Sequence, residues 1–350
     1  MAEKEVIETK EEKSIWKKLL DYFVITMNGM AYGLFSTLII GTIIGTIGSF
    51  FNDGTVVYNF LMELSTILKS LMGVGIGIGI AWVLKLEGLK LISAAAAGGI
   101  ATYMADIPGL GDPLVVYFVV VITIEALKFV FRKKTPVDII IIPLFVVLLS
   151  ALITTLIDGP VSAITSWIGQ IVSTATVYQP FIMGVVISVV MGMALTAPIS
   201  SAAIAIAIGL TGIAGGASVV GCSVQMIGFA VMSRKDNNIG TVLSVAVGTS
   251  MLQFKNIAKK PIIWLPTIIV SAILGPLATV VFKTVASPIG AGMGTSGLVG
   301  QIDTFDQMGM TTNAWISVIG LQIVAPIVLV YMIDYIFRKT GLIKPGDLKI

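Results

Sequence analysis

The chain has 350 residues, of which 56% are hydrophobic and only 12% charged, and its net charge is +3. Soluble domains carry about 25% charged residues, roughly twice this share. Apolar runs close to the roughly 20 residues that span a bilayer as a helix recur along the whole length. The composition therefore predicts an integral membrane protein in a lipid bilayer, and it excludes a soluble enzyme and a nucleic-acid-binding module.

Missing residue types narrow the chemistry further. The chain contains no histidine, and its one cysteine, Cys222, lies in an apolar run. This excludes a phosphohistidine, a histidine-ligated metal and a Ser-His-Asp triad within these residues. We therefore expect no catalytic residue, no metal and no cofactor in this chain.

Seven apolar runs are long enough to be membrane spans. They cover 22–51, 57–84, 88–105, 114–131, 138–157, 261–283 and 313–337. The stretch 178–232 is too long for one span and is broken at Thr196-Ala197-Pro198 and Gly215-Gly216, so it forms one crossing plus a hairpin or three short crossings. Basic clusters between alternate spans place both termini in the cytoplasm, which requires an even number of crossings. The total is eight or ten, and we expect about ten.

Three segments are predicted to lie outside the spans. Residues 1–21 run from charged to apolar, as in a cytoplasmic amphipathic segment on the membrane face; the alternative is a frayed tail that enters the first span. In 158–177, apolar residues at 164, 167, 168 and 171 share one helix face, so we predict an interfacial amphipathic helix that separates two halves. Residues 338–350 are predicted to form a cytoplasmic tail.

The second span has glycine at every other position from 73 to 79. No strand precedes this run, and it lies within apolar sequence. We therefore expect close packing of helices, within one chain or between two, and not a phosphate-binding loop.

Two further stretches are too polar and rich in glycine for spans, yet too apolar for free loops. Residues 240–254 lie between two basic clusters and 285–310 lie between the outer ends of two spans, so each must return to the side it came from. Both contain Gly-Thr-Ser-x-Leu, at 248–252 and at 294–298. Non-helical backbone at membrane depth occurs where protein or a water-filled cavity satisfies its polar groups, and transporters place such segments around the substrate. We predict two re-entrant hairpins whose tips meet near the midplane.

The candidate substrate-binding residues carry neutral hydroxyl or amide groups, which suit a small, polar, uncharged solute. They are Thr249, Ser250, Gln253, Thr295, Ser296 and Gln301, with Gln179 and Gln225 of the broken stretch 178–232 as further candidates. Glu63, Asp303 and Asp306 are candidates for ion or proton coupling. The alternatives are a chance repeat of the motif, helix–helix hydrogen bonds for the two further glutamines, and solvated entrance positions for the two aspartates.

Five spans, an amphipathic helix and a broken second half with two hairpins, together with the motifs at 248–253 and 292–301, resemble the membrane-embedded IIC component of sugar phosphotransferase systems. The two motifs look like those of its divergent PfoR, or toxin-regulator, branch. The resemblance implies an elevator-type transporter in the bacterial inner membrane, with a scaffold and dimerisation domain at 22–157 and a substrate-carrying domain at 178–337. It also implies a homodimer.

Sugar-specific members of that family commonly use a histidine and a hairpin glutamate at the sugar. This chain has no histidine, and neither hairpin core contains a glutamate. We therefore expect a carrier that moves a small sugar-like solute by alternating access, without phosphorylation chemistry or enzymatic activity of its own. The alternatives are a membrane-embedded sensor or regulator that binds a solute without net transport, and a phosphorylation-coupled permease with separate IIA and IIB partners.

Overall fold

The computed structural model describes residues 15–104, 112–133 and 135–350. Within these ranges the chain is mostly helical and has no β-strand, apart from one isolated bridge between Gly212 and Ala286. The all-helical prediction is therefore confirmed at this level. Most of the predicted N-terminal segment 1–21 lies outside the described residues.

The first half begins with a nearly continuous helical run and then folds back on itself. Thr55 caps the helix that follows the first loop, because its side chain accepts a hydrogen bond from the Tyr58 N–H. Asp112 caps the last helix of this half in the same way, through the Leu114 N–H at 2.9 Å. The helices are α1 (Ile15–Leu34), η1 (Phe35–Ile39), α2 (Ile40–Gly48), α3 (Val56–Ser70), α4 (Met72–Val83), α5 (Leu89–Met104) and α6 (Pro113–Val130).

The glycine run from 73 to 79 packs α4 between two neighbours of the same chain. A Cβ atom at Gly79 would lie 2.0 Å from the Gly29 carbonyl oxygen of α1. On the opposite face of α4, a Cβ atom at Gly73 or Gly77 would lie within 2.2 Å of backbone oxygens of α5. Alternate glycines thus let two helices approach α4 from two sides, which confirms the prediction of close packing and places it within one chain.

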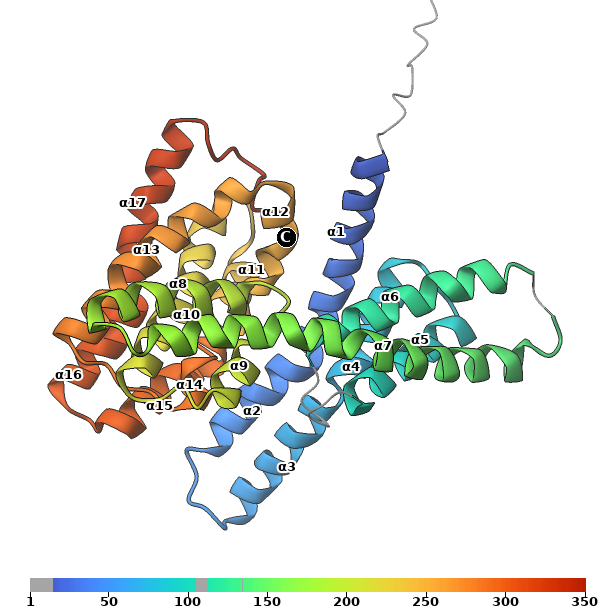
Figure 1. Ribbon diagram of the computed structural model, residues 1–350, viewed down its shortest axis with the longest axis horizontal. Coiled ribbons are helices and arrows are strands. Elements are labelled where there is room, and N and C mark those ends of the chain that lie inside the picture. Colours follow the sequence, from blue (N-terminus) through green and yellow to red (C-terminus); the bar gives the residue numbers. More distant parts are fainter. Residues whose placement is uncertain (1–14, 105–111, 134) are drawn as a thin grey trace, which may run out of the picture.

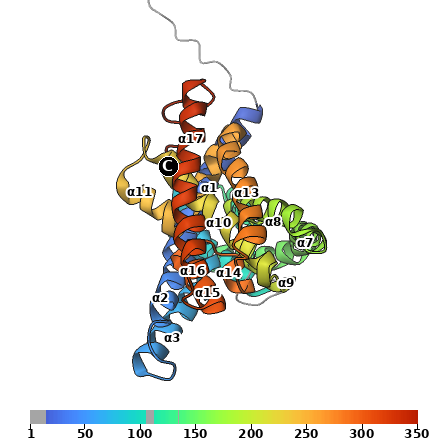
Figure 2. The same cartoon turned by 90° about the vertical axis from the view of Figure 1, so that its left-hand side faces the viewer.

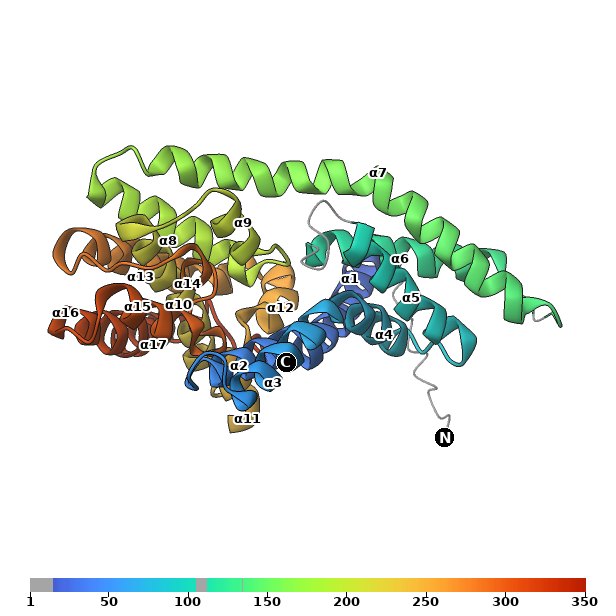
Figure 3. The ribbon, with the colours of Figure 1, turned by 90° about the horizontal axis from the view of Figure 1, so that it is seen from below.

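Helix α7 (Asp138–Ala175) corrects the prediction of a separate interfacial helix at 158–177. It runs without interruption for 38 residues and contains both Pro143 and Pro160. The change from apolar to mixed composition near 157 therefore does not mark the end of a helix. In Figure 3, α7 lies along one long edge of the molecule and reaches from α5 and α6 to α8 and α9.

The stretch 178–232 forms α8 (Pro180–Thr196), α9 (Ser201–Ala207) and α10 (Gly212–Ser233). The first residues of α8 share a groove with Ile213 at the start of α10, while Thr196 at the end of α8 contacts Gln225 near the end of α10. The two helices are therefore parallel, and the chain between them doubles back through α9. The stretch therefore makes an odd number of passes, one or three, as predicted, but α10 continues through Gly215-Gly216, where the sequence predicted a break.

The rest of the second half contains many short helices, because the chain turns at both Gly-Thr-Ser motifs. The first doubled-back segment consists of α11 (Ile239–Leu243), η2 (Ser244–Gly248), η3 (Ser250–Gln253) and α12 (Phe254–Lys259). The second consists of α14 (Pro288–Ala291), η6 (Ser296–Leu298) and α15 (Val299–Met308). The helices around them are η4 (Pro261–Trp264), α13 (Leu265–Pro276), η5 (Leu277–Val281), α16 (Thr312–Trp315), η7 (Ile316–Val324) and α17 (Ala325–Lys339).

Buried apolar side chains form three clusters. One belongs to α1 and α4 to α7. The other two lie mainly in the second half, where α10 contributes to both, and also include Ala31 of α1 and Val172 and Ala175 of α7. Figure 1 shows the corresponding arrangement: α8 to α17 gather on one side, α4 to α6 lie on the other, and α1 stands between them. Helices α2 and α3 extend together away from the rest (Figure 2).

The count of membrane spans differs from the prediction of about ten. Six helices of the described chain are long and apolar enough to cross a bilayer, or seven if the bent pair α3–α4 forms one span. The difference arises because α5 and α8 are shorter and because α3 and α4 meet at a bend of 48°. The chain is thus a multi-pass helical membrane protein, with fewer long spans than the sequence predicted.

Candidate functional site

The two Gly-Thr-Ser motifs lie at the turns of the two doubled-back segments, and these turns touch. The Ser296 hydroxyl donates a hydrogen bond to the Gly248 carbonyl oxygen at 2.9 Å, and the Thr295 hydroxyl donates to the Ala246 carbonyl oxygen. Thr295 and Ser296 are both buried. Two segments that are almost 50 residues apart in sequence therefore present the same motif to one another.

The second turn needs unusual backbone geometry. Gly294 and Gly297 have φ values of +53° and +55°, a left-handed region that favours glycine. Leu298 follows with φ +61°, which is strained for a residue with a side chain. At Gly294, a Cβ atom would also lie 2.7 Å from the Cys222 backbone, so the motif glycine serves both the turn and its contact with α10.

A third break reaches the same place. Helix α8 ends at Thr196, whose hydroxyl lies 2.9 Å from the Ser250 hydroxyl of the first turn. Five residues later, the Ser201 hydroxyl donates to the Gly292 carbonyl oxygen of the second segment at 2.6 Å. The sequence marks the break at 196–198, but its predicted site does not include the serines that follow.

A cavity of about 90 Å³ lies where the three breaks face the first half of the chain. The α1–α2 run contributes Leu34, Leu38, Ile39 and Thr42, and the remaining lining residues are Leu195, Ile199, Ser200, Ser201, Ala202, Met226, Gly248, Thr249, Met251, Gly292, Met293 and Ser296. Most of these side chains are apolar, a few carry hydroxyl groups, and none of the described lining residues is ionisable. An apolar lining with a few converging polar groups is typical of small-molecule sites, but such pockets have volumes of roughly 300–1,000 Å³, so this cavity must widen to hold a solute.

The structure brings four of the predicted substrate residues to this cavity or its rim. Thr249 and Ser296 line it directly. Ser250 and Thr295 lie behind them and hold the turns, since each is buried and hydrogen-bonded across to another break. The lining residues that sequence reasoning missed are Thr42, Ser200 and Ser201. Ser200 and Ser201 follow a visible break, whereas Thr42 lies in an apolar run and gave no signal.

The predicted glutamines point elsewhere. Gln253 donates to the Leu348 carbonyl oxygen at 2.9 Å and accepts from the Asn256 amide at 2.7 Å, so both ends of its amide bind near the C-terminus. Gln301 donates to the Gln322 side-chain oxygen at 2.7 Å and to the Ser223 hydroxyl. These two side chains stabilise the limbs of the segments and do not line the cavity.

Gln225 lies behind the first turn, fully buried on α10. Its side-chain oxygen accepts hydrogen bonds from the Trp264 indole and the Thr267 hydroxyl, both at 3.0 Å, and from Thr196 at 3.2 Å. The indole can only donate, which fixes the orientation of the amide. Its nitrogen has no protein partner in the structure. Gln225 therefore anchors Thr196, and through it Ser250, at the rim.

The remaining predicted residues lie outside the cavity. Gln179 is exposed at the start of α8, and Glu63 is exposed on α3. Asp303 accepts from both the backbone N–H and the hydroxyl of Ser287, so it caps the second segment. Asp306 is exposed on α15. The structure thus gathers the hydroxyl residues of the prediction but not its charged ones.

The sequence matches a family model described as "Phosphotransferase system, EIIC" over residues 24–350. The match begins in α1 and includes every residue that lines the cavity. No curated protein matches the chain significantly.

Proposed function

The chain belongs to the phosphotransferase-system EIIC family, whose membrane component is a permease of the sugar-transporter type, and we propose that it carries a small, polar, uncharged solute. The observation that carries this proposal is the meeting of both Gly-Thr-Ser turns at a cavity with hydroxyl and peptide groups and no ionisable side chain in its described lining. Such groups can match the hydroxyls of a sugar or polyol one by one, without burial of a net charge.

We further propose that the solute crosses by alternating access. The cavity is bounded on one side by α1–α2 and on the other by turns of the second half, so a shift of one against the other would open it. In this proposal the two doubled-back segments are re-entrant hairpins, residues 178–337 form the moving domain, and 22–157 form the scaffold that holds a second copy of the chain. The largest share of each half's buried apolar side chains lies in its own clusters, which supports this division, although Ala31 of α1 and Phe254 of α12 pack across it.

The proposal includes no phosphoryl transfer by this chain. Its one cysteine, Cys222, is fully buried and directed toward the carbonyl oxygens of Met191 and Ala291, and the sequence has no histidine. A phosphorylation-coupled permease would therefore depend on separate IIA and IIB proteins for every phosphoryl carrier. Membership in the PfoR branch, a place in the bacterial inner membrane and cytoplasmic termini are parts of the same proposal.

Solute binding by the purified protein in nanodiscs tests the proposal. The panel should pair neutral sugars and polyols with sugar acids of the same skeleton, with a rise in melting temperature as the readout. We expect a neutral member to bind and its acidic counterpart to bind much more weakly. Thr249→Val should weaken binding by about 2- to 12-fold, because one hydrogen bond contributes about 0.5–1.5 kcal/mol.

Thr66→Val is the matched control, since Thr66 is exposed on α3 and donates only to the Met62 carbonyl oxygen of its own helix. Equal binding by both variants and the parent would place the solute elsewhere. Uptake of the bound solute into proteoliposomes then separates the carrier from the regulator, because a regulator binds without net movement. Phosphorylated product that forms only when soluble partners are added would favour the coupled permease.

A further inference from the structure

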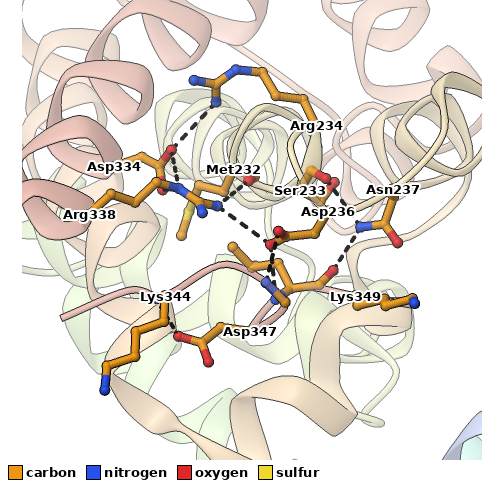
Figure 4. A network of polar contacts seen from close by, with 12 residues as sticks. Met232, Ser233, Arg234, Asp236, Asn237, Asp334, Arg338, Lys344, Asp347 and Lys349 are labelled. Atoms are coloured by element: carbon orange, nitrogen blue, oxygen red, sulfur yellow. Dashed lines mark hydrogen bonds and ion pairs between the residues drawn. The ribbon is translucent and has the colours of Figure 1, made fainter. Parts of the chain in front are cut away.

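The C-terminal residues after α17 fold back onto the second half. Ile343 and Leu348 are buried in the same apolar cluster as Phe229 of α10 and Ile257 of α12. Figure 4 shows how the end of α10 holds this segment through its backbone. Asp236 accepts from the Gly346 N–H at 2.9 Å. We call residues 341–350 the strap.

Asn237 adds a two-sided contact to the strap. Its amide nitrogen donates to the Leu348 carbonyl oxygen at 2.7 Å, and its oxygen accepts from the Ile350 N–H at 2.8 Å. Side chains of the turn that follows α10 thus pair with the strap backbone much as a neighbouring strand would. These hydrogen bonds hold the strap backbone in one conformation, whereas a solvated tail would have no fixed conformation.

The same strap also binds the return limb of the first doubled-back segment. Gln253 donates to the Leu348 carbonyl oxygen at 2.9 Å, and Asn256 donates to the Lys349 carbonyl oxygen at 3.1 Å. Lys260 forms an ion pair with Asp347 at 2.6 Å. The Leu348 carbonyl oxygen therefore accepts a hydrogen bond from Asn237, in the turn after α10, and one from Gln253 of the limb, so that the strap bridges these two parts.

The bridge lies close to the cavity along the chain. Gln253 is four residues from Thr249 and two from Met251, both of which line the cavity. The limb between them is helical, through η3 and α12, so a restraint on Gln253 and Asn256 also restrains the turn. The strap's own base is fixed separately, by Arg338 against Asp334 and Asp236.

We propose that the strap is a latch that holds the return limb of the first segment against α10, and that its release frees this limb to open the cavity. This inference rests on the proposed function, because opening of the cavity matters only if a solute passes through it. It adds a regulatory contact, between the strap and the return limb, to the same site. A charged or amide-rich cytoplasmic ligand that competes for the strap would raise the opening rate. Release of the latch changes the accessibility of the return limb, which can be measured without a solute.

The test measures alkylation of Met251→Cys by a small maleimide in the full-length protein in nanodiscs. Met251 lies on the limb at the cavity, and the native Cys222, buried on α10, reports global loosening in the same sample. The two sites are resolved by peptide mass. Lys260→Asp and Asp347→Lys each replace the ion pair by two like charges. We expect either change to raise labelling at position 251 by about 2- to 10-fold, with Cys222 unchanged.

The double variant Lys260→Asp, Asp347→Lys restores opposite charges and should return labelling to the parent rate. Lys349→Asp is the matched control, because it changes the charge of the same strap at an exposed side chain. No rise in the single variants, an equal rise in the control, a rise that the double variant does not reverse, or an equal rise at Cys222 would each overturn the latch. Loss of solute binding with this labelling pattern intact would instead count against the proposed function alone.

Discussion

Replacement of Arg338 by Met is expected to cost about 3–5 kcal/mol of stability, because it leaves buried carboxylates without their partner. Arg338 binds Asp334 at 2.9 and 3.1 Å, approaches Asp236 at 3.6 Å, and donates to the Met232 carbonyl oxygen at 2.8 Å. The Asp334 and Asp236 side chains are only 0% and 4% exposed. Arg234, at 3.4 Å from Asp334, is the other cation of this cluster, so two carboxylates would share one arginine.

A second substitution separates the cost of the uncompensated carboxylate from the cost of the packing that Arg338 provides. Asp334→Asn in the Arg338→Met background removes the uncompensated charge and should recover at least about 1 kcal/mol, whereas Asp334→Asn alone should destabilise. Thermal unfolding in detergent is the assay, and Arg132→Met is the control, since Arg132 is exposed and stacks only on Phe129 in the described contacts. A loss below about 1 kcal/mol in Arg338→Met, or no recovery in the double variant, would refute the reasoning.

The remaining predictions concern packing, pH and topology. Gly79→Val should lower the melting temperature far more than Gly99→Ala, because a Cβ atom lies 2.0 Å from a backbone oxygen at Gly79 but 3.3 Å from a methyl group at Gly99. Burial raises the pKa of Asp347, but bonds from Lys260 and the Lys344 N–H outweigh this and hold it below the usual range. The ion pair between Lys260 and Asp347 is therefore fully formed above about pH 4 and is lost as pH falls through the lowered pKa of Asp347. A spin label on the strap would report this loss as increased mobility. An impermeant thiol reagent added outside should label a cysteine at 112 but not at 133; the reverse result would invert the topology.

Local patterns in the sequence predicted the parts of the fold that depend on local chemistry. A helix needs only a run of apolar residues and a cap, so α6 and α13 lie, to within one residue, in the predicted spans 114–131 and 261–283. The alternate glycines from 73 to 79 predicted close packing because the absence of side chains has one common use inside a membrane. The repeated Gly-Thr-Ser motif predicted two turns at the site, because it recurs in two polar, glycine-rich stretches that must each return to the side they came from.

Contacts between distant residues could not be predicted in this way. The bond from Gln253 to Leu348 joins residues 95 positions apart, and nothing near Gln253 in the sequence distinguishes it from a substrate ligand. The composition suggested a span at 138–157 followed by an interfacial helix at 158–177, but it could not show that one helix, α7, continues through Pro160 from Asp138 to Ala175. Thr42 reaches the cavity only because α1–α2 crosses the second half, which is a property of tertiary packing.

The hydroxyl groups at the turns satisfy one another, and this determines which solutes suit the cavity. Ser296 is bonded to the Gly248 carbonyl oxygen, and Thr196 to Ser250. A solute that separates the turns must replace these bonds with its own, since a buried polar group without a partner costs about 1–3 kcal/mol. A neutral polyhydroxyl solute supplies donors and acceptors in exchange, whereas a charged solute would also lose its hydration with no counter-ion in the described lining. The solute thus replaces hydrogen bonds between the turns and adds few new ones, so we expect moderate affinity for the neutral solute. We expect strong discrimination against a charged solute, which also loses its hydration.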